Sequence, residues 1–271
     1  MTEKMQPLSV FGLPERRRIR GVLTDIDDTL TSEGKLTPEA YDALGRLHEA
    51  GFLVVPITGR PAGWCDHIAR MWPVDAVVGE NGAFYFRYDA KARKLEKRFL
   101  DDEATRAEKR ARLKRLGEKI LAAVPGAALA SDQLYRESDL AIDFCEDVPP
   151  LPPASVDRIV ALFEEAGCTA KISSIHVNGW FGDYDKLGMS RRLLKEVFAV
   201  DLDGHRDEFV YVGDSPNDQP MFAYFPHAVG VANVRDFTDR LKDKPRYVTP
   251  SRGGAGFAEL AADLLAARAR P

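Results

Sequence analysis

The fold is decided by Gly21-Val22-Leu23-Thr24-Asp25-Ile26-Asp27-Asp28-Thr29, a short apolar run that ends in three acids. The apolar half predicts a buried strand, since continuous runs of this length are typical of parallel strands covered on both faces. The three carboxylates repel one another, so their crowding into four positions favours a bound cation or a catalytic role. The alternative is a surface turn in which Asp28 and Thr29 only cap a neighbouring element.

Buried strands and helices alternate outward from this segment. Thr37 and Pro38 are typical of a helix start, Gly51 ends that helix, and the apolar run 52–57 predicts the next strand. This alternation predicts an α/β fold with a parallel, Rossmann-like core sheet and helices on both faces. Further elements of the same kind are helices at 61–72 and 186–198 and strands at 75–78, 209–212, 228–231 and 247–248.

The middle of the chain follows a different pattern. Residues 83–88 and 140–144 alternate in polarity, as half-buried antiparallel strands do, and 171–177 predicts one further strand. Two helices are expected, a charged one at 101–124 and one at 154–166 that follows a stiff connector with four prolines at 148–153. We therefore predict an α+β cap domain at residues 85–180, inserted into a discontinuous α/β core made of residues 19–84 and 181–271.

The composition is that of a globular protein. Of the 271 residues, 45% are hydrophobic, and the formal net charge is -4, without the basic excess of a nucleic-acid binder. The sequence contains no run of 18 apolar residues, so no membrane span is predicted. The basic residues near its start (Arg16, Arg17, Arg18 and Arg20) are interpreted as a solvated segment before the first strand rather than a targeting signal. Cys65, Cys145 and Cys168 lack metal-ligand spacing and form an odd set, which favours a reducing, cytoplasmic location.

Two other predicted strands also end in polar residues. The strand at 209–212 is followed by Gly213-Asp214-Ser215-Pro216-Asn217-Asp218, and the strand at 52–57 by Thr58-Gly59-Arg60. Because sites in open parallel sheets form beyond the carboxyl ends of the strands, these side chains are expected to meet the acids of the first segment. Hard cations such as Mg²⁺ prefer carboxylates, and a hydroxyl, a glycine amide and a helix start bind anions. The alternatives are an Asp-capped turn and an ordinary Thr helix cap.

Lys186 stands where the parallel pattern resumes. Most lysines are solvated, so this residue gains meaning only from its neighbours. In one site with the acids it can neutralise both phosphate and carboxylate charge.

These segments, in this order, resemble the haloacid dehalogenase superfamily, and in particular its Cof-type and sugar phosphatases with a cap inserted after the third core strand. The resemblance spans about residues 20–260. Asp28 stands where many members have glycine, a variant that also occurs among such phosphatases. The matching residues are Asp25 and Asp27 in the first motif, Thr58 in the second, Lys186 in the third, Asp214 and Asp218 in the fourth, with Asn81-Gly82 and 253–256 fitting the same group.

The resemblance implies a Mg²⁺-dependent phosphatase that hydrolyses a small phosphomonoester through an aspartyl-phosphate on Asp25. Asp27 is then expected to protonate the leaving alcohol and later to deprotonate the attacking water. Mg²⁺ is expected on Asp25, the backbone carbonyl of Asp27, Asp214 and Asp218, the last directly or through water. Thr58, the Gly59 amide and Lys186 are expected to hold the phosphoryl oxygens.

Other functions are open at this stage. A phosphomutase of the same superfamily would return the phosphoryl group to a sugar, whereas only a phosphatase releases inorganic phosphate. A non-catalytic binding module is disfavoured because the acidic set is complete. A dehalogenase needs neither the second acid at Asp27 nor the metal-binding acids, and it ranks well behind.

The cap is expected to select the substrate. Residues 173–184 (Ser-Ser-Ile-His-Val-Asn-Gly-Trp-Phe-Gly-Asp-Tyr) mix polar and aromatic side chains, which suits the face of a sugar, although the aromatics could equally fill the core of the cap. The charge run 106–119 is interpreted as a solvated helix face rather than an acidic-substrate patch. A small phosphorylated metabolite, preferably a sugar phosphate, is the expected ligand; sucrose-, mannosylglycerate- and trehalose-type phosphates, hexose phosphates and a broad range of small metabolites are all open. Candidate substrate-binding residues are Gly59, Arg60, Asn81, His176 and Asn217, with Arg136, Glu137 and Asp143 as weaker ones.

Overall fold

The computed structural model describes residues 5–269. Six parallel strands form the core sheet in the order β1-β15-β14-β13-β2-β5, which confirms the predicted α/β class. β2 lies inside the sheet, between β13 and β5, so its carboxyl end opens onto the same edge of the sheet as that of β13. The strands are β1 (Gln6–Pro7), β15 (Tyr247–Val248), β14 (Ala228–Gly230), β13 (Phe209–Gly213), β2 (Gly21–Thr24) and β5 (Leu53–Pro56).

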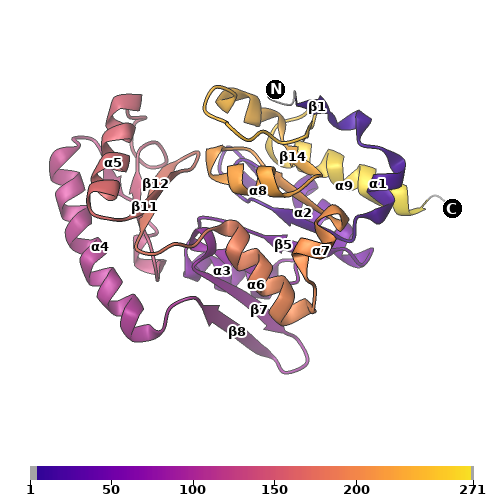
Figure 1. Ribbon diagram of the computed structural model, residues 1–271, viewed down its shortest axis with the longest axis horizontal. Coiled ribbons are helices and arrows are strands. Elements are labelled where there is room, and N and C mark those ends of the chain that lie inside the picture. Colours follow the sequence, from indigo (N-terminus) through magenta and orange to yellow (C-terminus); the bar gives the residue numbers. More distant parts are fainter. Residues whose placement is uncertain (1–4, 270–271) are drawn as a thin grey trace.

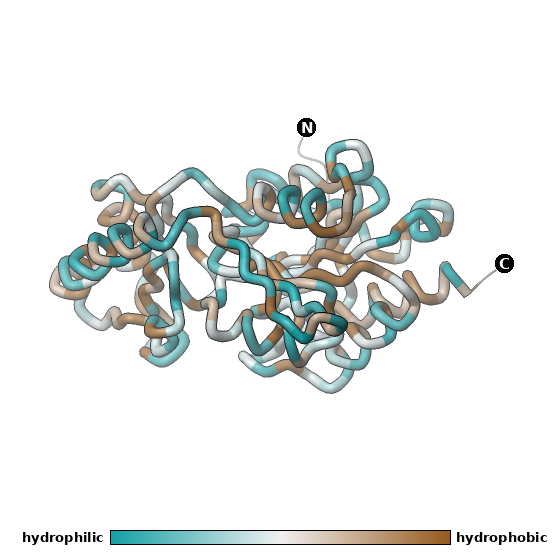
Figure 2. Tube along the Cα trace, turned by 90° about the horizontal axis from the view of Figure 1, so that it is seen from below, coloured by the Kyte–Doolittle hydropathy of each residue, from teal (hydrophilic) through white to brown (hydrophobic). Residues whose placement is uncertain are grey.

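Both faces of this sheet are covered, because its strands are apolar on both sides. Val22 packs into one hydrophobic cluster with α2, α3 and α9, while the next residue, Leu23, packs into a second with α6, α7 and α8. Figure 2 shows these hydrophobic strands at the centre of the core. The helices are α1 (Leu13–Arg18), α2 (Pro38–Glu49), α3 (Ala62–Met71), α6 (Lys186–Phe198), α7 (Leu202–His205), α8 (Gln219–Tyr224) and α9 (Gly253–Ala269).

A smaller sheet extends the core. β6 (Val77–Gly79) pairs antiparallel with β7 (Phe84–Asp89), β7 pairs with β8 (Lys94–Phe99), and one parallel bridge from Ile57 to Val78 joins β6 to the end of β5. Phe84 and Phe86 lie in the same hydrophobic cluster as α2 and α9. The division at residues 85 and 180 stays a prediction, and this packing favours a first boundary nearer residue 100. The hairpin β3 (Thr31–Ser32) and β4 (Lys35–Leu36) follows the acidic segment.

The inserted part forms a separate lobe (Figure 1). Its antiparallel sheet has the order β11-β12-β10-β9, and α4 and α5 enclose a third hydrophobic cluster. Trp180 and Phe181 are both buried, so these aromatics fill an interior rather than face a sugar. The elements are α4 (Glu103–Ala123), β9 (Ala128–Leu129), β10 (Leu140–Asp143), α5 (Pro153–Glu165), β11 (Thr169–Ile172) and β12 (His176–Trp180).

The single strand predicted at 171–177 is wrong. The segment makes a hairpin, because the Ser173 hydroxyl accepts hydrogen bonds from the amides of Ile175 and His176 and so stabilises a tight turn. The turn places the start of β12 toward the core, which matters for the site.

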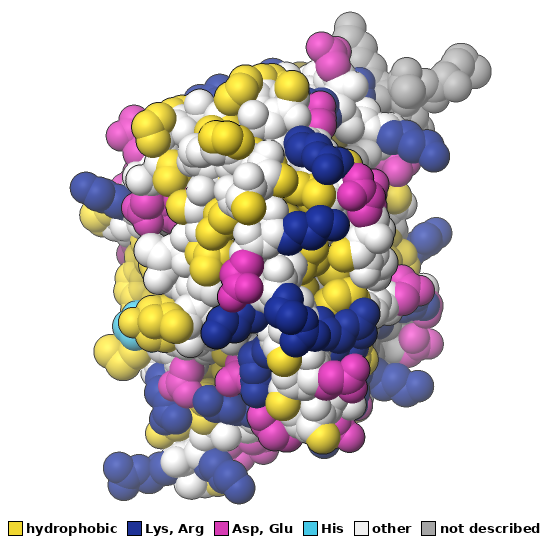
Figure 3. Space-filling view, turned by 90° about the vertical axis from the view of Figure 1, so that its left-hand side faces the viewer, with side chains coloured by type: hydrophobic (Ala, Val, Ile, Leu, Met, Phe, Trp, Pro, Cys, Tyr) yellow, Lys and Arg dark blue, Asp and Glu magenta, His cyan; other side chains and the backbone are white. Residues whose placement is uncertain are grey.

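The charged helix α4 has the solvated face that was expected. Leu113 and Ile120 are buried in the cap, whereas most of the charged side chains of this helix are exposed. Figure 3, which views this end of the molecule, shows lysine and arginine side chains interspersed with acids. From residue 112 onward, the exposed charged residues of α4 are Arg112, Lys114, Arg115, Glu118 and Lys119. Within residues 5–269, no helix has the length and apolar character needed to span a bilayer.

Candidate active site

Three buried carboxylates meet at the carboxyl ends of β2 and β13. Asp25 follows β2, Asp214 follows β13, and the Asp25 amide donates to the Val212 carbonyl at 2.8 Å, which continues the parallel pairing into the site. One oxygen each from Asp25, Asp214 and Asp218 lies within 4.8 Å of the others. The sheet topology therefore brings together acids that are almost 200 residues apart in sequence.

Lys186 is the cation of this cluster. It is the first residue of α6, and its ammonium group donates to Asp25 at 2.9 Å and to Asp218 at 2.7 Å. Burial by itself lowers the pKa of Lys186, but the charges of Asp218 and Asp25 outweigh it and leave that pKa raised, so the lysine stays charged.

Asp218 acts as an organiser of its loop. One of its oxygens accepts from Lys186 and from the Tyr211 hydroxyl, and the other accepts from the amides of Asp214 at 3.0 Å and Ser215 at 3.3 Å. These contacts close a capping box between Ser215 and Asp218. Since both oxygens of Asp218 are already engaged, the geometry favours a contact with a cation through water.

The Asp218 carboxylate also leaves no space for a side chain at Gly213. A β-carbon at that position would lie 2.3 Å from an Asp218 oxygen and 3.0 Å from the Tyr211 ring. We expect Gly213→Ala to displace Asp218 and with it Lys186, lowering kcat of the phosphatase reaction that the sequence resemblance implies about tenfold or more and stability by about 1–3 kcal/mol. Steady-state kinetics and thermal unfolding would measure both effects, and wild-type kcat in a folded variant would contradict this account of the loop.

The cluster carries more negative charge than its lysine can neutralise. Burial raises the pKa of Asp25 to about 7, with Lys186 opposing and Asp218 and Asp27 adding to the rise; burial and Asp218 likewise raise the pKa of Asp214. Within residues 5–269, the oxygens of Asp214 accept hydrogen bonds from two neutral donors, the Thr29 hydroxyl at 3.3 Å and the Asn233 amide at 3.1 Å. A buried excess of carboxylates with oxygen donors fits a hard divalent cation.

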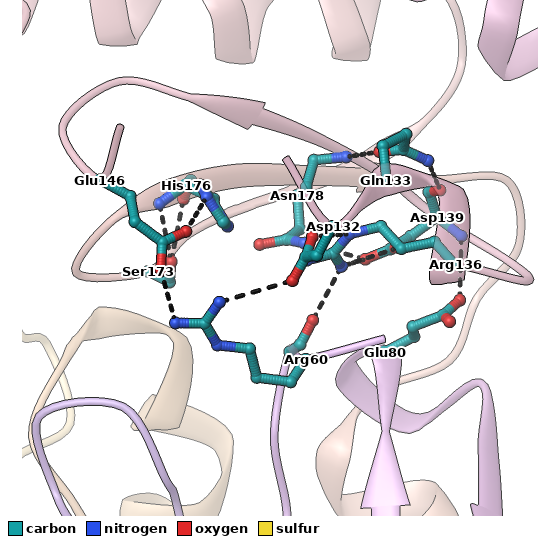
Figure 4. A network of polar contacts seen from close by, with 12 residues as sticks. Arg60, Glu80, Asp132, Gln133, Arg136, Asp139, Glu146, Ser173, His176 and Asn178 are labelled. Atoms are coloured by element: carbon teal, nitrogen blue, oxygen red, sulfur yellow. Dashed lines mark hydrogen bonds and ion pairs between the residues drawn. The ribbon is translucent and has the colours of Figure 1, made fainter. Parts of the chain in front are cut away.

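Asp27 lies outside this cluster and points toward the cap. Arg60 donates to its carboxylate through Nε at 3.0 Å and through Nη2 at 2.9 Å. The same guanidinium reaches two cap acids, Glu146 at 2.7 Å and Asp132 at 3.4 Å (Figure 4). Arg60 therefore links the core acid to the cap.

Glu146 extends that link to His176. The His176 Nε2 atom lies 2.9 Å from Glu146, and although burial by itself raises the pKa of Glu146, hydrogen bonds from His176 and Arg60 lower it to about 2. Asp143, one of the predicted cap candidates, holds this loop in place because its carboxylate accepts the amides of Cys145, Glu146 and Asp147. Its role is positional, since its own side chain is fully buried.

The second predicted motif lies beside the acids. The buried Thr58 hydroxyl accepts the Arg60 amide at 2.9 Å, which turns the chain into α3. A β-carbon on Gly59 would meet the Asn81 side chain at 3.2 Å, so the glycine allows Asn81 to pack close behind it. Gly59 itself lines the pocket between core and cap, whereas Thr58 and Asn81 do not line it.

One small pocket between core and cap collects most of the predicted residues. Asp25, Asp27, Gly59, Arg60, His176 and Asn217 line it together with Arg136, Ser173, Ser174, Ile175, Asn178 and Ser215. Glu137 instead pairs with Arg110 away from this pocket. Sequence reasoning missed Asp132, Glu146 and Asn178, because isolated polar residues in a cap carry no motif; Asn233 and Tyr211 were likewise not anticipated.

Comparisons with known proteins agree with this geometry. A family model for haloacid dehalogenase-like hydrolases matches residues 22–115. A phosphoglycolate phosphatase from Methanospirillum hungatei is 26% identical over 253 residues, covering 89% of this chain and 95% of its own. Together these matches support a phosphatase of the haloacid dehalogenase superfamily.

Solved structures share the fold of this phosphatase. A HAD/COF-like hydrolase from Plasmodium vivax aligns with a TM-score of 0.67 at 20% identity, covering 94% of this chain and 99% of its own. The sucrose-phosphatase from Synechocystis, solved with sucrose and phosphate, aligns with a TM-score of 0.62 at 16% identity, covering 92% and 98%. Both likenesses extend over the core and the cap, as expected for a cap inserted into a haloacid dehalogenase-like core.

Proposed function

We propose that this phosphatase depends on Mg²⁺ and transfers the phosphoryl group of a small phosphomonoester first to Asp25 and then to water. The observation that carries the proposal is the buried cluster of Asp25, Asp214 and Asp218 around Lys186 at the strand ends. Mg²⁺ bound to Asp25 and Asp214 would neutralise the charge that develops on the phosphoryl oxygens.

The residues of the chain divide the remaining work. Asp25 Oδ1 accepts the Lys186 hydrogen bond, which leaves Oδ2 as the attacking atom. Lys186 holds the carboxylate in position and offers positive charge to the phosphoryl group. The amide of Gly59, in the turn that leads into α3, would donate to a phosphoryl oxygen. Asp27, on the pocket side, would donate a proton to the leaving oxygen and later accept one from water.

The residues that line the pocket also indicate which classes of substrate it could bind. Two guanidinium groups, Arg60 and Arg136, face it together with His176 and Asn178. Such donors suit the hydroxyls of a sugar phosphate, which remains the predicted class. They equally suit a short ester that carries a second acid, such as the substrate named for the Methanospirillum relative.

We expect phosphate release from a panel of sugar phosphates, short phosphocarboxylic acids, nucleotides and p-nitrophenyl phosphate to require Mg²⁺. Removal of divalent cations with EDTA should lower kcat by about 10³-fold or more, and added Mg²⁺ should restore it, because the buried acids then regain their counter-charge. The best substrate would decide between sugar and acid. Undiminished release in EDTA would contradict the metal assignment, and transfer to a second sugar without free phosphate would indicate a mutase.

A further inference from the structure

The pocket is closed by the cap. Core residues such as Asp25 and cap residues such as His176 line opposite sides of a cavity whose volume is about 10 Å³. That is room for about one water molecule. A phosphomonoester does not fit between the core and the cap in this arrangement, so the two must separate for it to bind there, and some contact must bring them together again.

A single core carboxylate makes most of the hydrogen bonds at one side of this junction. Glu80, in the loop after β6, accepts the amides of Glu137 at 2.9 Å, Ser138 at 2.6 Å and Asp139 at 3.3 Å. It also accepts the amide of Ala62 at the start of α3. Figure 4 shows Glu80 on the core side, below Arg136 of the cap.

Consecutive backbone amides that converge in this way form a concave anion-binding nest. Here the amides belong to the cap, and the anion is the Glu80 carboxylate of the core. Arg136, the residue before the nest, adds a second link because it donates to the Gly59 carbonyl at 2.8 Å. Since Gly59 lines the pocket, the position of the nest is tied to that of the phosphate-binding turn.

We propose that Glu80 is the latch of this phosphatase, a positioning residue whose carboxylate enters the cap amide nest of Glu137–Asp139 and holds the cap closed over Asp25. When the cap opens, the three amides and the carboxylate separate and each is hydrated. When it closes, Glu146 of the cap reaches Arg60, which also contacts Asp27, so closure completes this link.

The loop that carries Glu80 is built to hold it in a fixed place. Glu80 and Asn81 have φ values of +44° and +55°, a conformation that costs non-glycine residues about 1 kcal/mol or more each. Gly82 follows at +110°, and a β-carbon there would lie 2.0 Å from the Asp185 carbonyl, next to Lys186. The loop that holds Glu80 therefore packs against the start of α6, whose first residue is Lys186.

Glu80→Gln tests the latch because a glutamine amide, in either orientation, cannot accept hydrogen bonds from all four backbone N–H groups. One Glu80 oxygen accepts from Ala62 and Glu137, and the other from Ser138 and Asp139. Either way of placing the glutamine directs its NH₂ group at two N–H donors. Ser138→Ala is the matched control, since it retains the backbone amide that Glu80 accepts.

Hydrogen exchange is the first readout, and it does not depend on the proposed function. Burial raises the pKa of Glu80 to about 8, so exchange is followed near pH 9, where the carboxylate is ionised. We expect the amides of residues 137–139 to exchange about tenfold faster or more in Glu80→Gln, with β13 unchanged and Ser138→Ala like the wild type. Equal acceleration in β13, or none at 137–139, would overturn the latch.

Activity is the second readout and rests on the proposed function. With p-nitrophenyl phosphate and Mg²⁺, Glu80→Gln should lower kcat about tenfold while Ser138→Ala does not. Glu80→Asp suits the positive φ but is one methylene shorter, so it should lose the protection at 137–139 as well. Full protection and full kcat in Glu80→Asp would overturn the proposal, whereas an inactive wild type with the expected exchange pattern would overturn only the proposed function.

Discussion

Asp25→Asn is expected to lower kcat for phosphate release by about 10⁴-fold or more, because an amide nitrogen or oxygen cannot replace the attacking carboxylate. The substitution preserves the shape of the side chain, so the acceptor for Lys186 at 2.9 Å can be retained by the amide oxygen. The loss should therefore appear in kcat, while the KM for the ester changes little.

The folded state should tolerate this change, and above neutral pH it should gain stability. Burial raises the pKa of Asp25 to about 7 from an ordinary value of 3.8. An acid whose pKa is raised by folding contributes stability below its unfolded pKa, and that contribution is lost as the pH rises through the folded value. The amide introduced by Asp25→Asn does not titrate, so without Mg²⁺ the variant should unfold at a higher temperature than the wild type near pH 8.

Asp28→Asn provides the matched control. Asp28 is the neighbouring acid, it has a φ of +55° that asparagine accepts, and it lies outside the cluster of Asp25, Asp214 and Asp218. Its kcat should stay within a few-fold of the wild type. A variant at Asp25 that kept more than about a hundredth of the wild-type kcat would rule out an aspartyl-phosphate on this residue.

Much of the core could be predicted because its signals are local. A strand buried on both faces, such as β2, is apolar throughout, and Thr37 both predicts the start of α2 and caps it by accepting the Ala40 amide. The acids at 25 and 214 were expected to meet because parallel strands end at the same edge of a sheet. The structure shows that they do.

The cap and its contacts could not be predicted in the same way. The hairpin at Ser173 divides a run that contains no glycine or proline to mark a turn, and the side chain–backbone bonds of the folded turn reveal it. Glu80 and Glu146 each acquire a role from amides or cations that arrive from distant segments. A single acid in a sequence gives no sign of such partners, because the contact depends on how the two lobes meet.

Asp27→Asn should separate chemistry at the leaving group from chemistry at phosphorus. Asparagine cannot donate the proton that an alkoxide needs, so the rate of phosphoryl transfer from an alkyl phosphate to Asp25 should fall by about 10²–10⁴-fold. p-Nitrophenolate is a far weaker base and leaves without help, so the same rate for p-nitrophenyl phosphate should fall much less, by about tenfold. The measurement is the ratio of these two losses in single-turnover experiments, where formation of the aspartyl-phosphate is observed by itself.

Arg60 determines how that ratio is interpreted. Its guanidinium contacts Asp27 through two nitrogens and also contacts Glu146, so asparagine at position 27 both removes a proton donor and leaves part of a buried cation unpaired. Misplacement of Arg60 or of the cap would slow both esters alike, because it affects binding and closure rather than the leaving group. Equal losses would therefore assign Asp27 to holding Arg60, whereas a loss at least tenfold greater for the alkyl ester would assign it the proton.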